Sequence, residues 1–196
     1  PTPPTIDTQN DIIQAGGNIW LDRNLGAQRV STSSTDAQAY GDYYQWGRSA
    51  DGHEKVTSQS INGDLSANRP DNATDSCVWD GMFITRTTED RNWLTNTSTN
   101  NSLWQGDGGV NDPCPAGYRV PTTAEFNSLG MTGANSADSI LKLPMAGIRD
   151  PTDGKSKLQG GNNGGYFTNE VSGADFKLAL LSQDGYRITN RPRTQG

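Results

Sequence analysis

The segment from Gln105 to Asp112 carries the side chains best suited to chemistry, and that chemistry is coordination of a metal ion. Asp107, Asn111 and Asp112 place carboxylate and amide oxygens on a glycine-rich turn. A hard cation such as calcium takes about six to eight such oxygens from side chains and backbone carbonyls. The same residue types are common in solvated turns that hold no ion. The segment alone therefore leaves a calcium site and an ordinary loop both open.

Two further loop segments, residues 149–153 and the glycine-rich residues 159–163, also carry oxygen-bearing side chains. If the strands between them pack as one sheet, the three loops can converge at one end of it. If the loops supply only some of the ligands of an ion bound there, the ion keeps a coordination position free for a carboxylate or a pair of hydroxyls from a partner. That arrangement predicts a binding site rather than a catalytic one.

Catalytic motifs are missing from the sequence. A single histidine, His53, excludes most nucleophilic triads and the zinc motifs that need two histidines. Its neighbours are polar, so we expect it to be an exposed loop residue. The run Gly154-Lys155-Ser156 resembles the end of a phosphate-binding loop, but Arg149 stands where that motif needs its first glycine. The chain is therefore not predicted to be an enzyme.

Charge and hydropathy exclude two classes of partner. The net charge of −6 disfavours nucleic acid, because binding to phosphates depends on clustered lysine and arginine. No run approaches the roughly 18 apolar residues that a membrane-spanning helix needs. An acidic surface rich in asparagine is compatible with bound divalent cations and with an extracellular location, which is the location we expect.

The elements that position these loops are predicted to be short. Only 31% of the 196 residues are hydrophobic and 23 are glycine, which indicates a β-rich, loop-rich α+β fold of short antiparallel sheets with one or two helices. The expected helices are residues 87–94 and 123–129, the second with Thr122 and Glu125 as a capping box and Gly130 as a C-cap. The expected strands are residues 18–22, 40–47, 118–120, 141–148, 166–168, 176–181 and 186–188.

The run from Tyr40 to Gly47 is the densest aromatic segment of the chain. Aromatic residues favour strands and bury a large area each, so this run is expected to be a strand that contributes to the core. A platform for a ligand is the alternative role.

The cysteines and the chain ends bear on compartment and domain organisation. Cys77 and Cys114 can form one disulfide or remain as two buried thiols, and the sequence leaves both open. Residues 1–8 have the composition of a stiff linker, as in a piece of a longer protein. Residues 9–196 are expected to form one ligand-binding domain.

The order of motifs resembles the Fibrobacter-type major paralogous domain, a surface module related in fold to C-type lectins. The segments that carry the resemblance span most of the chain, and they are Trp20-Leu21-Asp22-Arg23-Asn24-Leu25, Tyr40-Gly41-Asp42-Tyr43-Tyr44-Gln45-Trp46-Gly47, Cys114-Pro115-Ala116-Gly117-Tyr118-Arg119-Val120-Pro121-Thr122, Leu143-Pro144-Met145-Ala146-Gly147-Ile148-Arg149-Asp150 and Gly164-Gly165-Tyr166-Phe167-Thr168. One departure is that the family's final cysteine strand is not found after Arg193.

Within that family the chain looks most like the peptide-binding domain of giant calcium-dependent RTX adhesins, which act in cell adhesion and biofilms. The resemblance implies a C-type-lectin-like fold and binding of short C-terminal peptides of surface proteins, whose terminal carboxylate completes the coordination of a calcium ion. It implies Asp107, Asn111, Asp112 and Asp150 as metal ligands. It implies Gln105, Arg149, Gln159, Asn162 and Asn163 as ligand-binding residues. A calcium-dependent carbohydrate-binding module is the alternative function.

Overall fold

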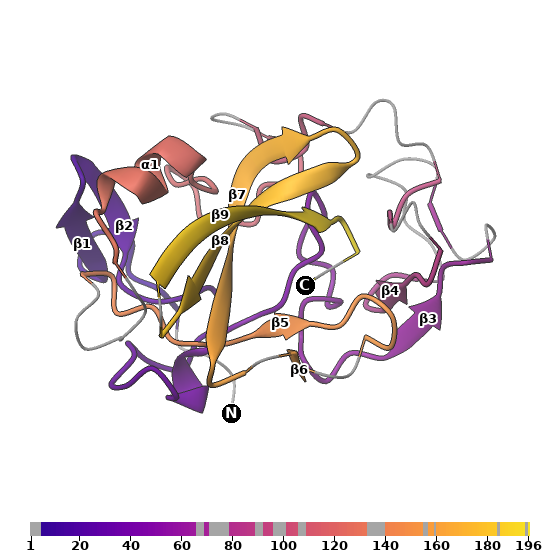
Figure 1. Ribbon diagram of the computed structural model, residues 1–196, viewed down its shortest axis with the longest axis horizontal. Helices are drawn as coiled ribbons and strands as arrows, with labels where there is room; N and C mark the ends of the chain where they lie inside the picture. The colour runs from indigo at the N-terminus through magenta and orange to yellow at the C-terminus, as the bar shows by residue number, and fades with distance from the viewer. Residues whose placement is uncertain are drawn as a thin grey trace.

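The last third of the chain forms the largest sheet of the molecule. A computed structural model describes residues 5–65, 69–70, 79–88, 92–95, 101–105, 109–132, 140–154, 157–158, 160–183, 185–194 and 196. Strands β7 (Asn163–Ser172), β8 (Asp175–Ser182) and β9 (Gly185–Pro192) pair antiparallel in that order, with β9 at the edge (Figure 1). The sequence predicted strands at residues 176–181 and 186–188 with a turn at residues 183–185 between them, and the pairing of Ser182 with Gly185 confirms this hairpin.

A hairpin and a helix pack beside one end of this sheet. Strands β1 (Ile12–Ala15) and β2 (Asn18–Leu21) pair antiparallel across the Gly16-Gly17 turn. The turn and the strand after it were predicted, whereas β1 was not. Helix α1 (Thr123–Ser128) lies above them in Figure 1. Thr122 and Glu125 exchange the two hydrogen bonds of a capping box, which satisfies two amides that the first turn leaves without partners.

Two short strand pairs and one 3-10 turn complete the described secondary structure. Strands β3 (Ser60–Asn62) and β4 (Phe83–Thr85) pair parallel, and β5 (Ile148–Arg149) pairs antiparallel with β6 (Lys157–Leu158). A 3-10 turn, η1, covers Ala37–Ala39. The structure is therefore β-rich, with short sheets and very little helix. No helix among the described residues is long and apolar enough to cross a membrane.

The two glycines at the start of β7, Gly164 and Gly165, have a packing role. A Cβ atom on Gly164 would lie 2.7 Å from the carbonyl oxygen of Pro144, and one on Gly165 would lie 2.6 Å from a methyl group of Ile148. Both distances are shorter than a carbon side chain tolerates. Glycine therefore lets β7 approach the segment that leads into β5, where Gly147 and Gly164 form a parallel bridge.

Several predicted elements are wrong. The aromatic run 40–47 is buried coil rather than a strand, and its backbone turns through positive φ at Gly41 and Gly47. Residues 118–120 form no strand, and of residues 141–148 only Ile148 belongs to one. Residues 87–88 and 92–94 are not helical, while residues 89–91 of that predicted helix lie outside the described part of the chain. The predicted core role of the aromatic run is confirmed, because Tyr43, Tyr44 and Trp46 are buried.

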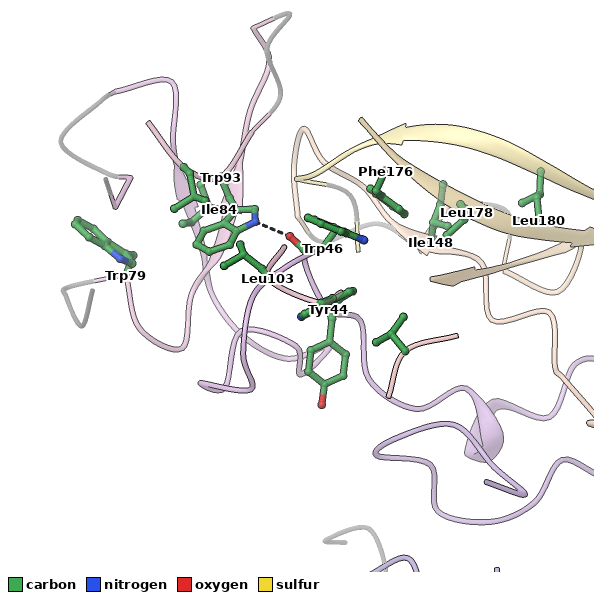
Figure 2. Packing of buried hydrophobic residues seen from close by; sticks show 13 residues of the cluster. Tyr44, Trp46, Trp79, Ile84, Trp93, Leu103, Ile148, Phe176, Leu178 and Leu180 are labelled. Atoms are coloured by element: carbon green, nitrogen blue, oxygen red, sulfur yellow. Dashed lines mark hydrogen bonds between the residues drawn. The ribbon is translucent and has the colours of Figure 1, made fainter. Parts of the chain in front are cut away.

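The larger of two hydrophobic clusters joins the coil to the sheet. Trp46 lies at its centre, with its ring 6.4 Å from that of Phe176 on β8 and nearly parallel to it (Figure 2). The indole of Trp46 donates to the carbonyl of Thr168, and the indole of Trp93 donates to the carbonyl of Trp46. Trp46 and Trp93 thus satisfy their only polar side-chain atom while their rings fill the core.

Buried polar side chains hold the coil around this cluster. Gln45 is fully buried, and its amide donates to the carbonyls of Ile84 and Thr194 and accepts from Arg48 and from the Ile84 amide. All four hydrogen-bonding positions of the side-chain amide are therefore filled. In this region side chains provide the hydrogen bonds that neighbouring strands provide for one another in the β7–β8–β9 sheet.

Candidate functional site

A partly open pocket of about 220 Å³ lies between the hairpin, the coil and the sheet. It is larger than the roughly 150 Å³ cavity that is known to hold benzene. Five segments that are distant in sequence line it, namely residues 19–25 with β2, residues 39–44, residues 113–121, residues 141–147 and residues 165–167 of β7. Phe126 of α1 adds an aromatic ring, 5.5 Å from that of Trp20.

The walls of the pocket are mainly apolar, although five tyrosines line it, and three of them make hydrogen bonds that join neighbouring segments. The hydroxyl of Tyr43 donates to the carbonyl of Ala146, and that of Tyr118 donates to the carbonyl of Thr8, each at 2.8 Å. The hydroxyl of Tyr166 donates to the carbonyl of Pro144. These hydroxyls tie neighbouring segments together. Burial also raises the pKa of the Tyr43 and Tyr166 phenols, which keeps them neutral.

Three of the four charged side chains around the pocket are paired. Arg23 contacts Asp22 at 2.6 Å and Asp11 at 2.9 Å. Arg119 contacts Glu125 at 2.7 Å. Asp42 contacts Lys55 at 2.7 Å, although burial still raises the pKa of the Asp42 carboxyl. Arg23 and Lys55 each contact two carboxylates, because Lys55 also lies 3.5 Å from Glu54, so these paired groups leave no excess of positive charge.

Lys142 is the fourth charged residue. It is exposed between the buried Leu141 and Leu143, and its ammonium has no hydrogen-bond or ion-pair partner among the residues that the structure describes. Its backbone has a φ of 49°, the one positive φ of a non-glycine residue within the described ranges. A lysine in this left-handed conformation is strained and persists only where its neighbours hold it.

Cys114 also lines the pocket, as a half-buried free thiol. Burial, followed by the nearby Asp112 carboxylate, raises the pKa of this thiol, so the reactive thiolate is disfavoured at neutral pH. The disulfide that the sequence left open is not formed at Cys114. Cys77 lies outside the described residues.

The predicted calcium loop runs directly into the 113–121 wall of the pocket. Gln105 is exposed at its start, and Asp107 lies outside the described residues. Asn111 is buried and its amide donates to the carbonyl of Gly47, while the Asp112 carboxylate accepts from the amides of Cys114 and Val120. These contacts fix the shape of the loop. The Cys114 thiol also hydrogen-bonds to this carboxylate, so about one of its four acceptor positions remains for an ion.

The other two predicted loops lie at opposite ends of the β5–β6 hairpin rather than at a common end. Asp150 caps its own turn by accepting from the amide and hydroxyl of Thr152. Asn162 is exposed, and Asn163 is the first residue of β7 and pairs with Ser182. Gln159 lies outside the described residues. No described hydrogen bond joins either loop to residues 109–112.

Arg149, predicted to contact a ligand, is almost fully buried. Its guanidinium donates to the carbonyls of His53, Lys55, Ser58 and Gly154 and to the Ser58 hydroxyl. Desolvation lowers the pKa of this guanidinium to about 10, which still leaves it charged at neutral pH. In this structure Arg149 ties together the loop that follows His53.

His53 is fully buried, and the prediction that it is exposed is wrong. The signal that could have located it is the pair of carboxylates close to it in sequence, Asp51 and Glu54, since buried histidines need polar partners. Its Nε2 accepts from the amide of Gln45 at 3.0 Å, so Nδ1 carries the proton and donates to Asp51 at 2.7 Å. Desolvation lowers the pKa of His53 to about 4, because it outweighs the contribution of Asp51.

Asp51, His53 and Glu54 form a second candidate site, because one ligand atom from each lies within 4.8 Å of the others. This group could hold a metal ion. Imidazole and carboxylate ligands suit zinc or another transition metal better than calcium. An ion would have to replace the Nδ1 proton, and it would compete with the bonds that Asp51 makes to Arg48 and that Glu54 accepts from the Gly52 amide. The set is a complete hydrogen-bond network without an ion.

Comparison with family models, with curated proteins and with solved structures finds no match to this chain. The geometry of the pocket and its neighbouring loop therefore carries the functional argument.

Proposed function

We propose that this chain is an extracellular adhesin module, with a C-type-lectin-like fold, that binds short C-terminal peptides of surface proteins. The terminal carboxylate of the peptide completes the coordination of a calcium ion held by the loop of residues 105–112. The motif order described above supports this function. Calcium supplies a fixed double positive charge that distinguishes a chain end from internal peptide units, which carry no charge.

The observation that carries the proposal is the direct continuity between the predicted ion loop and the pocket wall. Asp112 ends the loop, and Pro113 and Cys114 already line the pocket. An extended chain advances about 3.3 to 3.6 Å per residue. A carboxylate fixed at the loop thus leaves the preceding two or three side chains within reach of an apolar pocket that can hold one of them.

The chemistry of the pocket supports binding rather than catalysis. The tyrosine hydroxyls have structural partners, the raised pKa of Cys114 disfavours a nucleophilic thiolate, and both nitrogens of the buried His53 are engaged. Apolar walls with few polar groups are typical of sites that hold a ligand by burial. Ordering an extended peptide costs entropy, so a strong anchor such as a desolvated carboxylate on a cation is needed.

Calorimetry with a panel of short peptides tests the proposal. We expect binding in calcium, loss of binding in chelator, and loss when the peptide's carboxyl end is amidated. The variant Asp107→Asn should weaken calcium-dependent binding at least tenfold. The matched change Asp175→Asn, at the start of β8 and away from the pocket lining, should leave it unchanged.

Two outcomes would contradict the proposal. Binding that survives both chelation and amidation would show that neither the calcium ion nor the terminal carboxylate is needed for recognition of the peptide. Competition by free monosaccharide, without competition by peptides, would instead identify a calcium-dependent carbohydrate-binding module.

A further inference from the structure

The charges around the pocket do not cancel completely. Arg23, Arg119 and Asp42 each have a partner of opposite sign, at distances of 2.6 to 2.9 Å. Lys142 has none among the described residues. A site with apolar walls and one uncompensated ammonium is complementary to a ligand that combines an apolar group with a negative charge.

The backbone places Lys142 in the lining of the pocket. Leu141 and Leu143 are buried in the smaller hydrophobic cluster, together with Phe126 and Leu181. The two anchored leucines fix the turn between them and hold Lys142 in its left-handed conformation, with φ of 49°. Strain that packing maintains around an exposed charged residue is typical of binding sites. Glycine or asparagine would fit this turn with less strain but would provide no charge.

An exposed apolar side chain extends the lining of the same pocket. Ile19 on β2 is 56% exposed, which is high for an isoleucine, and it also lines the pocket. Its neighbour Trp20 packs against Phe126. A ligand seated in the pocket can therefore cover Ile19 while its acidic group meets Lys142.

We propose that the pocket selects a peptide segment in which an acidic side chain adjoins an apolar one, and that Lys142 holds the acidic group. This inference rests on the proposed function for the peptide nature of the ligand. Its ion pair is separate from the calcium anchor, so it gives the site a sequence preference that a terminal carboxylate cannot provide. Lys142 is then the specificity-determining residue of the pocket.

The test uses small probes in chelator, so that calcium does not contribute. The probes are 3-phenylpropionate and its neutral amide, which share a shape and differ in charge. Dissociation constants are measured by two-dimensional NMR, with the Trp20 indole and the amides of residues 141–147 as reporters. We expect the acid to bind the wild-type chain about fivefold more tightly than the amide does, which is the effect expected of one partly exposed charged contact.

Three variants isolate the charge. Lys142→Asn suits the left-handed backbone and should reduce the preference for the acid to none, while Lys142→Arg should retain it. Lys177→Gln removes a lysine that is paired with Glu170 and does not line the pocket, so it should leave the preference unchanged. Increasing the salt concentration should reduce the preference of the wild type.

Several results would overturn the inference. These are equal binding of acid and amide by the wild type, an unchanged preference in Lys142→Asn, or no shift of the pocket reporters with either probe. An acid preference that persists while calcium-dependent peptide binding fails would reject the proposed function and keep the role of Lys142. Calcium-dependent peptide binding without any preference for the acid would reject the role of Lys142 and keep the proposed function.

Discussion

The β7–β8–β9 sheet and the coil that includes residues 40–59 are stabilised in different ways. In the sheet, backbone groups pair with one another along ladders that are interrupted once, between Phe167 and Val171 of β7, and side chains contribute mainly buried apolar surface. In the coil, buried polar side chains such as Gln45 and Arg149 satisfy backbone groups that have no strand partner. The first arrangement tolerates exchange of one apolar residue for another. The second depends on particular donors and acceptors at particular positions.

The largest effect is expected from Arg149→Met. The change leaves four carbonyl oxygens without the donors they now have in a buried site, and we expect a loss of about 3 to 5 kcal/mol in the free energy of unfolding. Urea denaturation measures it. The matched change Arg187→Met, at an exposed position on β9, should cost no more than about 0.5 kcal/mol. Similar costs for the two variants would contradict the structural role of Arg149.

A pair of similar substitutions compares the two regions directly. Gln45→Met removes a buried amide whose four hydrogen bonds are all made, and should cost about 3 kcal/mol. Leu181→Met, at a fully buried position near the end of β8, nearly conserves volume and should cost less than about 1.5 kcal/mol. The comparison fails if the leucine variant is the less stable of the two in urea.

Acid should weaken the coil before it weakens the sheet. The folded-state pKa of His53, about 4, lies below the value near 6.5 of an unfolded chain. The unfolded state therefore binds more protons in this interval, and stability is full above pH 6.5 and falls as the pH drops toward 4. The slope is at most about 1.4 kcal/mol per pH unit.

Thermal unfolding between pH 7 and pH 5 measures this dependence. The variant His53→Gln removes the titrating ring and should flatten the curve in that interval, although it is less stable throughout. Asp51 also has a lowered pKa, with His53 and Arg48 as its stabilising partners, but it loses its contribution only at lower pH. An unchanged slope in His53→Gln would assign the acid sensitivity to other groups.

The smallest effect is expected at the capping box of α1. Thr122→Ala removes the hydroxyl that accepts from the Glu125 amide, and should cost about 1 kcal/mol. Thr189→Ala, on β9 outside the helix, serves as the control of equal chemistry. Calorimetric melting of both variants measures the difference, and an equal loss in the two would show that the cap contributes little.

The sheet and the coil also differ in how far the sequence predicts them. The β8–β9 hairpin and the capped helix follow from patterns within a few residues, namely alternation, a turn and the Thr122–Glu125 pair. The aromatic run at 40–47 has the propensity of a strand, yet Gly41 and Gly47 turn its backbone and Gln45 replaces a strand partner. Such a replacement depends on residues far away in the chain, which local patterns do not contain.

The candidate site shows the same limit. The sequence identified an oxygen-rich loop but not the pocket beside it, because β2, Cys114, Lys142 and β7 come together only in the folded chain. It assigned Arg149 to a ligand because of its charge, whereas the structure uses that charge to hold backbone carbonyls. It passed over Lys142, since nothing in a sequence indicates a positive φ at a lysine.

The position of β9 at the edge of its sheet affects how copies of the chain behave at high concentration. Its outer backbone groups offer a template to which another strand can add, and such edges are a frequent origin of aggregation. Arg187 and Arg191 lie four residues apart on this strand and so project on the same face. Two copies that paired edge to edge would bring these guanidinium groups together, and their repulsion keeps the chains apart in solutions of low ionic strength.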